Sequence, residues 1–245
     1  MKKLITAIVS FFVISFTLKG YVPEEERDVI WLYLENNLKK ISLYLEVSFD
    51  GKVILKTKQN NKTVVKEGYV KKVYVKDFFR ETKDSQLMNY SRKIDLSKML
   101  FYQGDIIRIS ASISGEIRRV VAPLNYFSKT FVYAFNEIYK ASLELPQTNN
   151  YVSFISAVPL EGEVYANFLK MVPGGYVLPV IETSELKKNS YIFKAVSNPW
   201  RLIGITSKKD ESEIMDFASY KRLYGIKSAF YIGTTRGNFQ LSIVE

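Results

Sequence analysis

The chain of 245 residues contains neither cysteine nor histidine. Without cysteine it can form no disulfide, offers no thiol nucleophile and has no cysteine to carry a lipid anchor. Without histidine it cannot assemble a Ser-His-Asp or Cys-His catalytic group, and zinc sites built from these two residue types are excluded as well. Any catalysis would therefore have to use carboxylate, lysine, serine, threonine or tyrosine chemistry.

Acidic residues are too few to balance the basic ones, because 25 Asp and Glu stand against 35 Lys and Arg, a formal net charge of +10. The acids show no calcium-loop spacing, and the Pro173-Gly174-Gly175 turn lacks the Lys-Ser pair of a phosphate loop. We therefore expect no metal and no cofactor. The basic balance favours acidic partners, such as anionic lipid head groups, acidic cell-wall polymers or an acidic protein surface.

The first twenty residues have the features of an export signal. Two lysines precede an uncharged apolar run from Leu4 to Leu18, which suits a signal-peptide core and is shorter than the roughly 20 residues of a bilayer span. We expect residues 1–20 to be a signal peptide or an N-terminal anchor. Both remain open because the cleavage site is poorly formed, so residues 4–18 could keep the protein attached to the membrane. The folded part is then periplasmic or otherwise extracytoplasmic, and we expect no nucleic-acid partner.

Residues 28–122 are rich in β-prone runs, and we expect them to form a β-sandwich-like unit. Apolar and polar side chains alternate from Ile41 to Phe49, as in a half-buried strand, and Asp50-Gly51 then makes a hairpin turn. Residues 24–40 have helix-like ends around a β-prone middle, so helix and strand both stay open there. The other elements expected in this unit are strands at 52–58, 63–75, 106–111 and 116–121, a polar loop at 77–93 and a helix at 95–101.

An amphipathic helix is expected over residues 124–140, because Phe127, Phe131 and Phe135 fall on one helical stripe. It joins the first unit to a second β-rich unit, residues 141–245, which also contains a helix at 211–224. The strands expected in this second unit are 151–157, 163–168, 176–181, 191–196, 201–206, 228–233 and 238–244. The predicted fold class is thus mainly β (α+β), with two β-sandwich-like units joined by the amphipathic helix and one further helix near the C-terminus.

Two short patterns suggest catalysis, and both have simpler interpretations. Ser184 and Lys187 match the Ser-x-x-Lys pattern of serine-lysine acyl enzymes, but the companion elements of those enzymes are missing and the segment is typical of a polar turn. Glu161 and Glu163 flank a glycine and could act as a carboxylate pair in glycoside hydrolysis. Because Pro159, Leu160 and the glycine favour a turn over a strand that carries both carboxylates, we predict no catalytic residues.

Tyrosines beside basic residues are the main candidates for binding. Between Lys66 and Tyr74 the chain alternates aromatic, apolar and basic residues, and an exposed surface of that kind could stack on sugars or cover a partner. Arg118-Arg119 is a further basic doublet, although such doublets are usually solvated. The predicted binding residues are Tyr69, Lys71, Lys72, Tyr74, Arg118 and Arg119.

Residues 140–245 contain several short apolar patterns that are typical of strands. These are Tyr151 to Ile155, Gly162 to Tyr165, Asn167-Phe168, Tyr176 to Pro179, and the run from Trp200 to Lys208. In these patterns the segment resembles the bacterial domain-of-unknown-function family 4384. The resemblance implies a β-sandwich accessory domain of envelope proteins, with no catalytic residues to carry over.

Three functions are compatible with the sequence. The first is an exported, non-catalytic cell-envelope protein that binds a protein partner or an anionic surface polymer. The second is a structural subunit of a surface appendage or particle, with residues 4–18 or 124–140 as its assembly helix. The third is an exported hydrolase that depends on carboxylates, with Glu161 or Glu163 as its candidates.

Overall fold

The computed structural model describes residues 28–36, 41–59, 62–89, 104–171, 180–220, 225–226, 229–235 and 237–244. The predicted N-terminal signal or anchor and the predicted helix at 95–101 lie outside these residues. The described chain forms two sheets with helices, so the predicted fold class, mainly β with α-helices, is confirmed. None of the described helices is long and apolar enough to cross a membrane.

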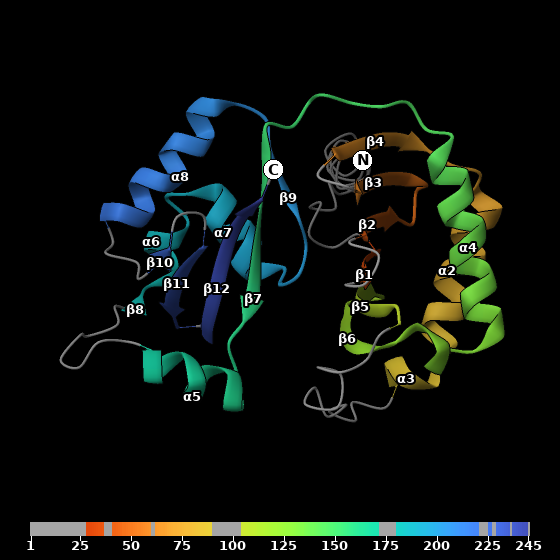
Figure 1. Ribbon diagram of the computed structural model, residues 1–245, viewed down its shortest axis with the longest axis horizontal. Coiled ribbons are helices and arrows are strands. Elements are labelled where there is room, and N and C mark those ends of the chain that lie inside the picture. The colour runs from red at the N-terminus through yellow and green to blue at the C-terminus, as the bar shows by residue number, and fades with distance from the viewer. Residues whose placement is uncertain are drawn as a thin grey trace, which may run out of the picture.

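The first sheet has six antiparallel strands in the order β4-β3-β2-β1-β5-β6. Helices α2 and α4 lie side by side along one of its faces, with α3 near β6 (Figure 1). We call this sheet with its helices the first unit. Its elements are β1 (Val29–Asn36), β2 (Ile41–Ser48), β3 (Lys52–Gln59), β4 (Lys62–Tyr69), α2 (Lys72–Asp84), α3 (Gln86–Asn89), β5 (Ile106–Ile113), β6 (Glu116–Pro123), a 3-10 turn (Leu124–Tyr126) and α4 (Lys129–Leu143).

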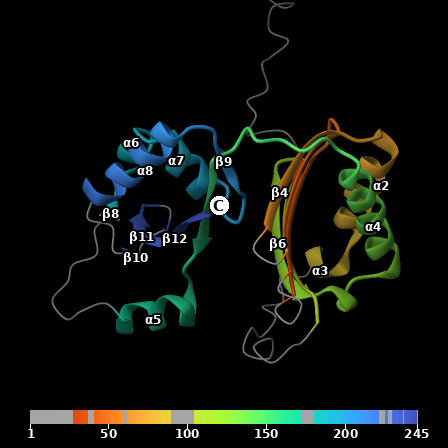
Figure 2. The same cartoon turned by 45° about the horizontal axis from the view of Figure 1, so that its top comes forward.

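The two faces of the first sheet differ because side chains alternate along each strand. On β2, Leu43, Leu45 and Val47 face the helices and belong to the core of the first unit. The same core takes the apolar stripe of α2 and that of α4, where the rings of Phe78 and Phe131 lie 6.0 Å apart. The opposite face of the sheet carries polar and aromatic side chains and looks toward the rest of the chain (Figure 2).

The second unit is a sheet of order β10-β11-β12-β7-β9, antiparallel throughout, with β8 added parallel to β11. Buried side chains of α6, α7 and α8 pack on this sheet and form the second core. The elements are β7 (Ser153–Pro159), α5 (Gly162–Met171), β8 (Val180–Ile181), α6 (Thr183–Leu186), α7 (Ser190–Ser197), β9 (Ile203–Ile205), α8 (Lys208–Tyr220), β10 (Gly225–Ile226), β11 (Ala229–Thr234) and β12 (Gly237–Val244).

Several local predictions are corrected by the structure. Residues 163–168 and 191–196, expected as strands, belong to the helices α5 and α7. The strand expected at 63–75 ends at Tyr69, and α2 replaces the later part of that strand and most of the loop expected at 77–93. The undecided segment 24–40 contains strand β1 in its described part. Residues 176–179 and 221–224 lie outside the description.

The spacing of buried residues in α2 and the N-cap of α7 explain why these two segments form helices and not strands. In α2 the buried residues Val75, Phe78, Phe79 and Thr82 follow the i, i+3, i+4, i+7 pattern of a helix, which overrides the β-prone Val-Tyr-Val at its start. In α7 the side chain of Asn189 accepts a hydrogen bond of 3.1 Å from the backbone N–H of Ile192, and this N-cap starts the helix. In α2, the spacing of apolar residues by three and four positions therefore indicated the secondary structure better than the β-propensity of single residues.

The predicted amphipathic helix at 124–140 corresponds to the 3-10 turn followed by α4. Ser128 caps α4, and its apolar stripe, with Phe131, Phe135 and Ile138, is buried in the core of the first unit. Helix α4 therefore packs as part of the first unit, and the chain that follows it leads into the second unit. The division of the chain at residues 122 and 141 stays a prediction.

Residues 198–202 of the second unit make a hydrogen-bonded contact with the polar face of the first sheet. The indole N–H of Trp31 donates to the carbonyl of Pro199 at 3.1 Å. The guanidinium of Arg201 donates two hydrogen bonds to the carboxylate of Glu46, at 2.7 and 3.0 Å. Three bonds thus join a central strand pair, β1 and β2, to the segment that precedes β9.

Tyr44 completes this contact from the neighbouring position on β2. Its hydroxyl donates to Glu46 at 2.6 Å and accepts from the backbone N–H of Leu202 at 3.2 Å. Burial, with the carboxylate of Glu46 close by, raises the pKa of Tyr44 well above its ordinary value. The phenol therefore keeps its proton throughout the physiological range and remains a donor to Glu46.

Replacing Arg201 by methionine should destabilise the protein strongly. The side chain of Glu46 is only 6% exposed, so Arg201→Met leaves a buried carboxylate with its guanidinium partner gone. We expect the free energy of unfolding in urea to fall by about 3–5 kcal/mol. The matched control is Arg108→Met, which breaks the more exposed pair with Glu35 and should cost less than about 1 kcal/mol. Equal losses for both variants would contradict this account.

Candidate functional site

A cleft of about 890 Å³ lies between the two units. One wall is the polar face of the first sheet, and the other comes from β7, β12 and the start of α8. A volume of this size is in the range of pockets that hold small ligands or short polymer segments, about 300–1,000 Å³. We call it the inter-unit cleft.

The side chains of the first wall enter the cleft because of strand register. Tyr33 pairs with Tyr44, and Tyr44 pairs with Lys56, so these three stand in one row across β1, β2 and β3. The next row lies two residues further along each strand. It consists of Ser42 in the middle, with Glu35 and Lys58 as its paired neighbours. A period of two places both rows on the same face of the sheet, which is the face that lines the cleft.

Four of the six charged side chains in the cleft neutralise one another in pairs. Arg108 donates to Glu35 at 3.1 Å, within the first sheet. Lys208 and Glu211 pair at 2.7 Å on the first turn of α8. The hydrogen bond from Lys208 lowers the pKa of Glu211, which therefore stays ionised at neutral pH.

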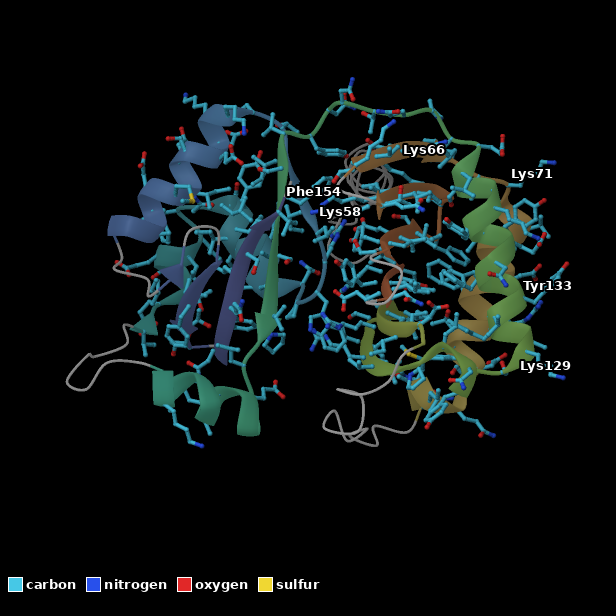
Figure 3. All side chains as sticks on the ribbon, viewed as in Figure 1. Lys58, Lys66, Lys71, Lys129, Tyr133 and Phe154 are labelled. Atoms are coloured by element: carbon cyan, nitrogen blue, oxygen red, sulfur yellow. The ribbon has the colours of Figure 1, made fainter. Side chains whose placement is uncertain are left out.

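Lys56 and Lys58 are the two remaining charges, and both are positive. Within the described part of the chain, neither ammonium group has a hydrogen-bonded or ion-paired carboxylate. Lys56 is 8% exposed, and its Nζ lies 4.9 Å from the centre of the Phe154 ring. Burial, together with the charge of Lys58, lowers the pKa of Lys56 to about 8. Figure 3 shows Lys58 and Phe154 between the two units.

Aromatic rings form the rest of the wall beside these lysines. Trp200 and Tyr33, both partly exposed, pack around the buried side chains of Val29, Trp31 and Tyr44. Trp200, Tyr33 and Tyr44 all line the cleft. The cleft therefore combines an aromatic surface with two ammonium groups that have no carboxylate partner among the described residues.

This arrangement suits binding of an anion. An ammonium group in a half-dry site interacts more strongly with a carboxylate or phosphate than one on an open surface, because water screens the charge less. Among the described residues no carboxylate offsets the desolvation cost of Lys56, and an incoming anion would do so. Among the described residues, no cluster of three acidic side chains is placed to hold a metal ion.

The residues predicted from the sequence lie elsewhere and do not form one site. Tyr69 ends β4 and is 70% exposed, Lys71 is the N-cap of α2, and Lys72 is its first residue. Tyr74 is partly buried against the core of the first unit. These four residues gather at one edge of the first sheet, and Figure 3 shows Lys71 on the helical side, away from the cleft.

Arg118 and Arg119 lie on β6, at the opposite edge of the same sheet. Adjacent strand residues point to opposite faces, so the doublet is divided between them. Arg118 is bound to Glu116 and to Asn89 of α3, on the helical side. Arg119 is therefore on the other face, and the doublet does not present a paired positive charge.

The structure also shows where the residues of the two possible catalytic patterns lie. Ser184 is exposed in the short helix α6, and Lys187 is the C-cap of that helix, with its Nζ 5.6 Å from the centre of the Phe193 ring. Glu161 is exposed just before α5, and Glu163 belongs to this helix instead of sharing a strand face with it. The spacing argument that paired the two glutamates therefore does not apply.

Sequence reasoning missed Lys56, Lys58 and Trp200. The lysines occupy alternate positions of a strand that was expected correctly, so a Lys-x-Lys pattern on the polar face was the available signal. The pattern does not reveal the opposing wall of the cleft, which comes from residues about 100 to 190 positions later in the chain. In comparisons with known proteins, no family model and no curated protein matches the chain. The resemblance of residues 140–245 to family 4384 therefore stays a prediction.

Replacing Lys56 by methionine should stabilise the protein at neutral pH. Methionine fills similar space without the cost of burying an ammonium group, so the free energy of unfolding at pH 7 should rise by about 1–3 kcal/mol. The cost is fully present below pH 8 and is relieved between pH 8 and the ordinary value of 10.5, because the folded state loses the proton first. Urea unfolding from pH 7 to 10 should show the difference between the two proteins shrinking.

The exposed neighbour supplies the control for this experiment. Lys58→Met removes a charge of the same sign from the same strand, and we expect it to change the free energy of unfolding by less than about 0.5 kcal/mol. A loss of stability in Lys56→Met that persists at every pH would mean that the amine has a protein partner and is not available for a ligand.

Proposed function

We propose that this protein is an exported, non-catalytic component of the cell envelope that binds an anionic surface polymer in the inter-unit cleft. The observation that carries this proposal is the pair Lys56 and Lys58, two ammonium groups on one strand face with no carboxylate partner among the described residues. Export rests on the signal or anchor expected in residues 1–20. The net charge of +10 supports an acidic partner.

The geometry favours an extended ligand over a compact ion. Lys56 and Lys58 are separated by one residue of an extended strand, so their side chains are about 6–7 Å apart along the wall. Successive charged units of a polymer can occupy the two positions, whereas a small ion would satisfy only one. The charge of each ammonium is then neutralised without removing either existing ion pair.

Binding of polyanions should depend on the two cleft lysines. For the variant Lys56→Met/Lys58→Met we expect the affinity for polygalacturonate and for polyphosphate, measured by titration calorimetry at low salt, to fall tenfold or more. The expectation follows because each lysine contributes a charge-assisted hydrogen bond in a partly dry site.

The matched control is Lys71→Met/Lys72→Met, which removes the same charge from the helical side of the sheet. Its affinity should stay within about twofold of the original, because it acts only through long-range, salt-screened attraction. Equal losses in the two double variants would contradict the cleft and favour a diffuse basic surface. Recovery of the protein in the cytoplasmic fraction of cells would contradict export.

The affinity should also decline in alkaline solution. Lys56 is charged below pH 8 and loses its proton as the pH rises through that value, so the ligand loses one of its two ammonium partners. We expect polygalacturonate to bind more weakly at pH 9 than at pH 7, whereas Lys56→Met should show a flat profile over this range. A steep profile in Lys56→Met would assign the titration to another group.

A further inference from the structure

Residues Asn198 to Arg201 form a β-turn with an unusual third residue. The backbone N–H of Arg201 donates to the carbonyl of Asn198 at 3.1 Å, which closes the turn, and Pro199 occupies its second position. Trp200 in the third position has φ of +72°. Proline followed by a residue of positive φ is the arrangement of a type II turn, in which the third position is normally glycine or asparagine.

A tryptophan with positive φ is strained, because its Cβ crowds the backbone in the left-handed region. Such strain persists only where the surroundings hold it, and it occurs mainly at ligand sites. Here the turn is held on three sides: the N–H of Trp200 donates to Ala157 of β7 at 2.8 Å, Pro199 accepts from Trp31, and Arg201 is bound to Glu46. The side chain at this position must therefore matter for something that glycine would not supply.

The indole of Trp200 is divided between packing and the cleft. Part of it covers the buried group of Val29, Trp31 and Tyr44, and the residue stays partly exposed on the cleft wall. Lys56 and Lys58 line the same cleft. A flat apolar surface and two positive charges are thus offered to one ligand.

We propose that the ligand is an acidic glycan, whose sugar ring stacks on Trp200 while its carboxylates meet Lys56 and Lys58. A pyranose ring has an apolar face of C–H groups that packs against an aromatic ring, and a uronic acid adds a carboxylate at the edge of that ring. Polyphosphate has the charge but no apolar face, so it would use the lysines alone. This inference rests on the proposed function, since it names the class of polymer for the same cleft.

The experiment compares three short probes by titration calorimetry: trigalacturonate, tripolyphosphate and the neutral maltotriose. The original protein should bind trigalacturonate and tripolyphosphate and should bind maltotriose at least about tenfold more weakly. In Trp200→Gly the affinity for trigalacturonate should fall about tenfold, whereas that for tripolyphosphate should change less than twofold. Glycine suits the positive φ, so the turn itself is retained.

Tryptophan fluorescence gives a second readout, because the chain has only two tryptophans and Trp31 is 1% exposed. Trigalacturonate should shift the emission of the original protein and leave that of Trp200→Gly unchanged. Trp200→Asn, a residue that tolerates positive φ, serves as the second variant if the glycine variant unfolds, and urea unfolding identifies that case.

The outcomes separate the two proposals. If tripolyphosphate binds in a lysine-dependent manner and trigalacturonate does not, or if the loss in Trp200→Gly is equal for both probes, the glycan assignment is overturned and the anion-binding cleft stands. If neither anionic probe binds, the proposed function is overturned as well. A twofold or smaller effect of Trp200→Gly on trigalacturonate would leave the tryptophan as packing between the units and would also overturn the glycan assignment.

Discussion

The ion pair between Glu46 and Arg201 is the central contact that joins residues 198–202 of the second unit to the polar face of the first sheet, beside the cleft. Both side chains are largely removed from water, and each is satisfied by several hydrogen bonds, including the one from Tyr44 to Glu46. A buried pair of this kind adds little net stability compared with apolar packing, but it accepts only one geometry. Together with the bond from Trp31 to Pro199, it positions residues 198–202, and with them Trp200, against the strands that carry Tyr33, Tyr44 and Lys56.

Lys56 and Trp200 share a physical property: each occupies its position at an energetic cost, from burial of a charge in Lys56 and from a left-handed backbone in Trp200. Lys56 is buried without a carboxylate partner in the described chain, and Trp200 holds a backbone conformation that suits glycine. Local conflicts of this sort are expected at functional sites, where stability is given up for binding. Their coincidence in one cleft is the reason to place the site there instead of at the exposed tyrosines and lysines of the helical side.

The sequence predicted the first sheet well and the helices of both units less well. Strands β2 and β3 were expected within one residue of their bounds, because Asp50-Gly51 marks the turn and each strand alternates cleanly. The strand predictions for segments 163–168 and 191–196 were wrong because short apolar runs look alike as strand and helix. For 191–196 the helix buries Ile192, Ala195 and Val196 in the second core, a contact that no local pattern shows. The six predicted binding residues were selected for exposure and charge, which do not reveal which residues face a second wall.

The site depends on contacts between distant residues, and this explains why no local pattern revealed it. The bonds from Trp31 to Pro199 and from Glu46 to Arg201 join residues more than 150 positions apart. In isolation, the polar face of β2 and β3 is an ordinary solvated face, and Lys56 on it would be an ordinary surface lysine. The contact of residues 198–202 covers part of that face and places Trp200 on the wall of the same cleft as the two lysines. The proposed binding site therefore needs both units, because neither sheet alone supplies both walls of the cleft.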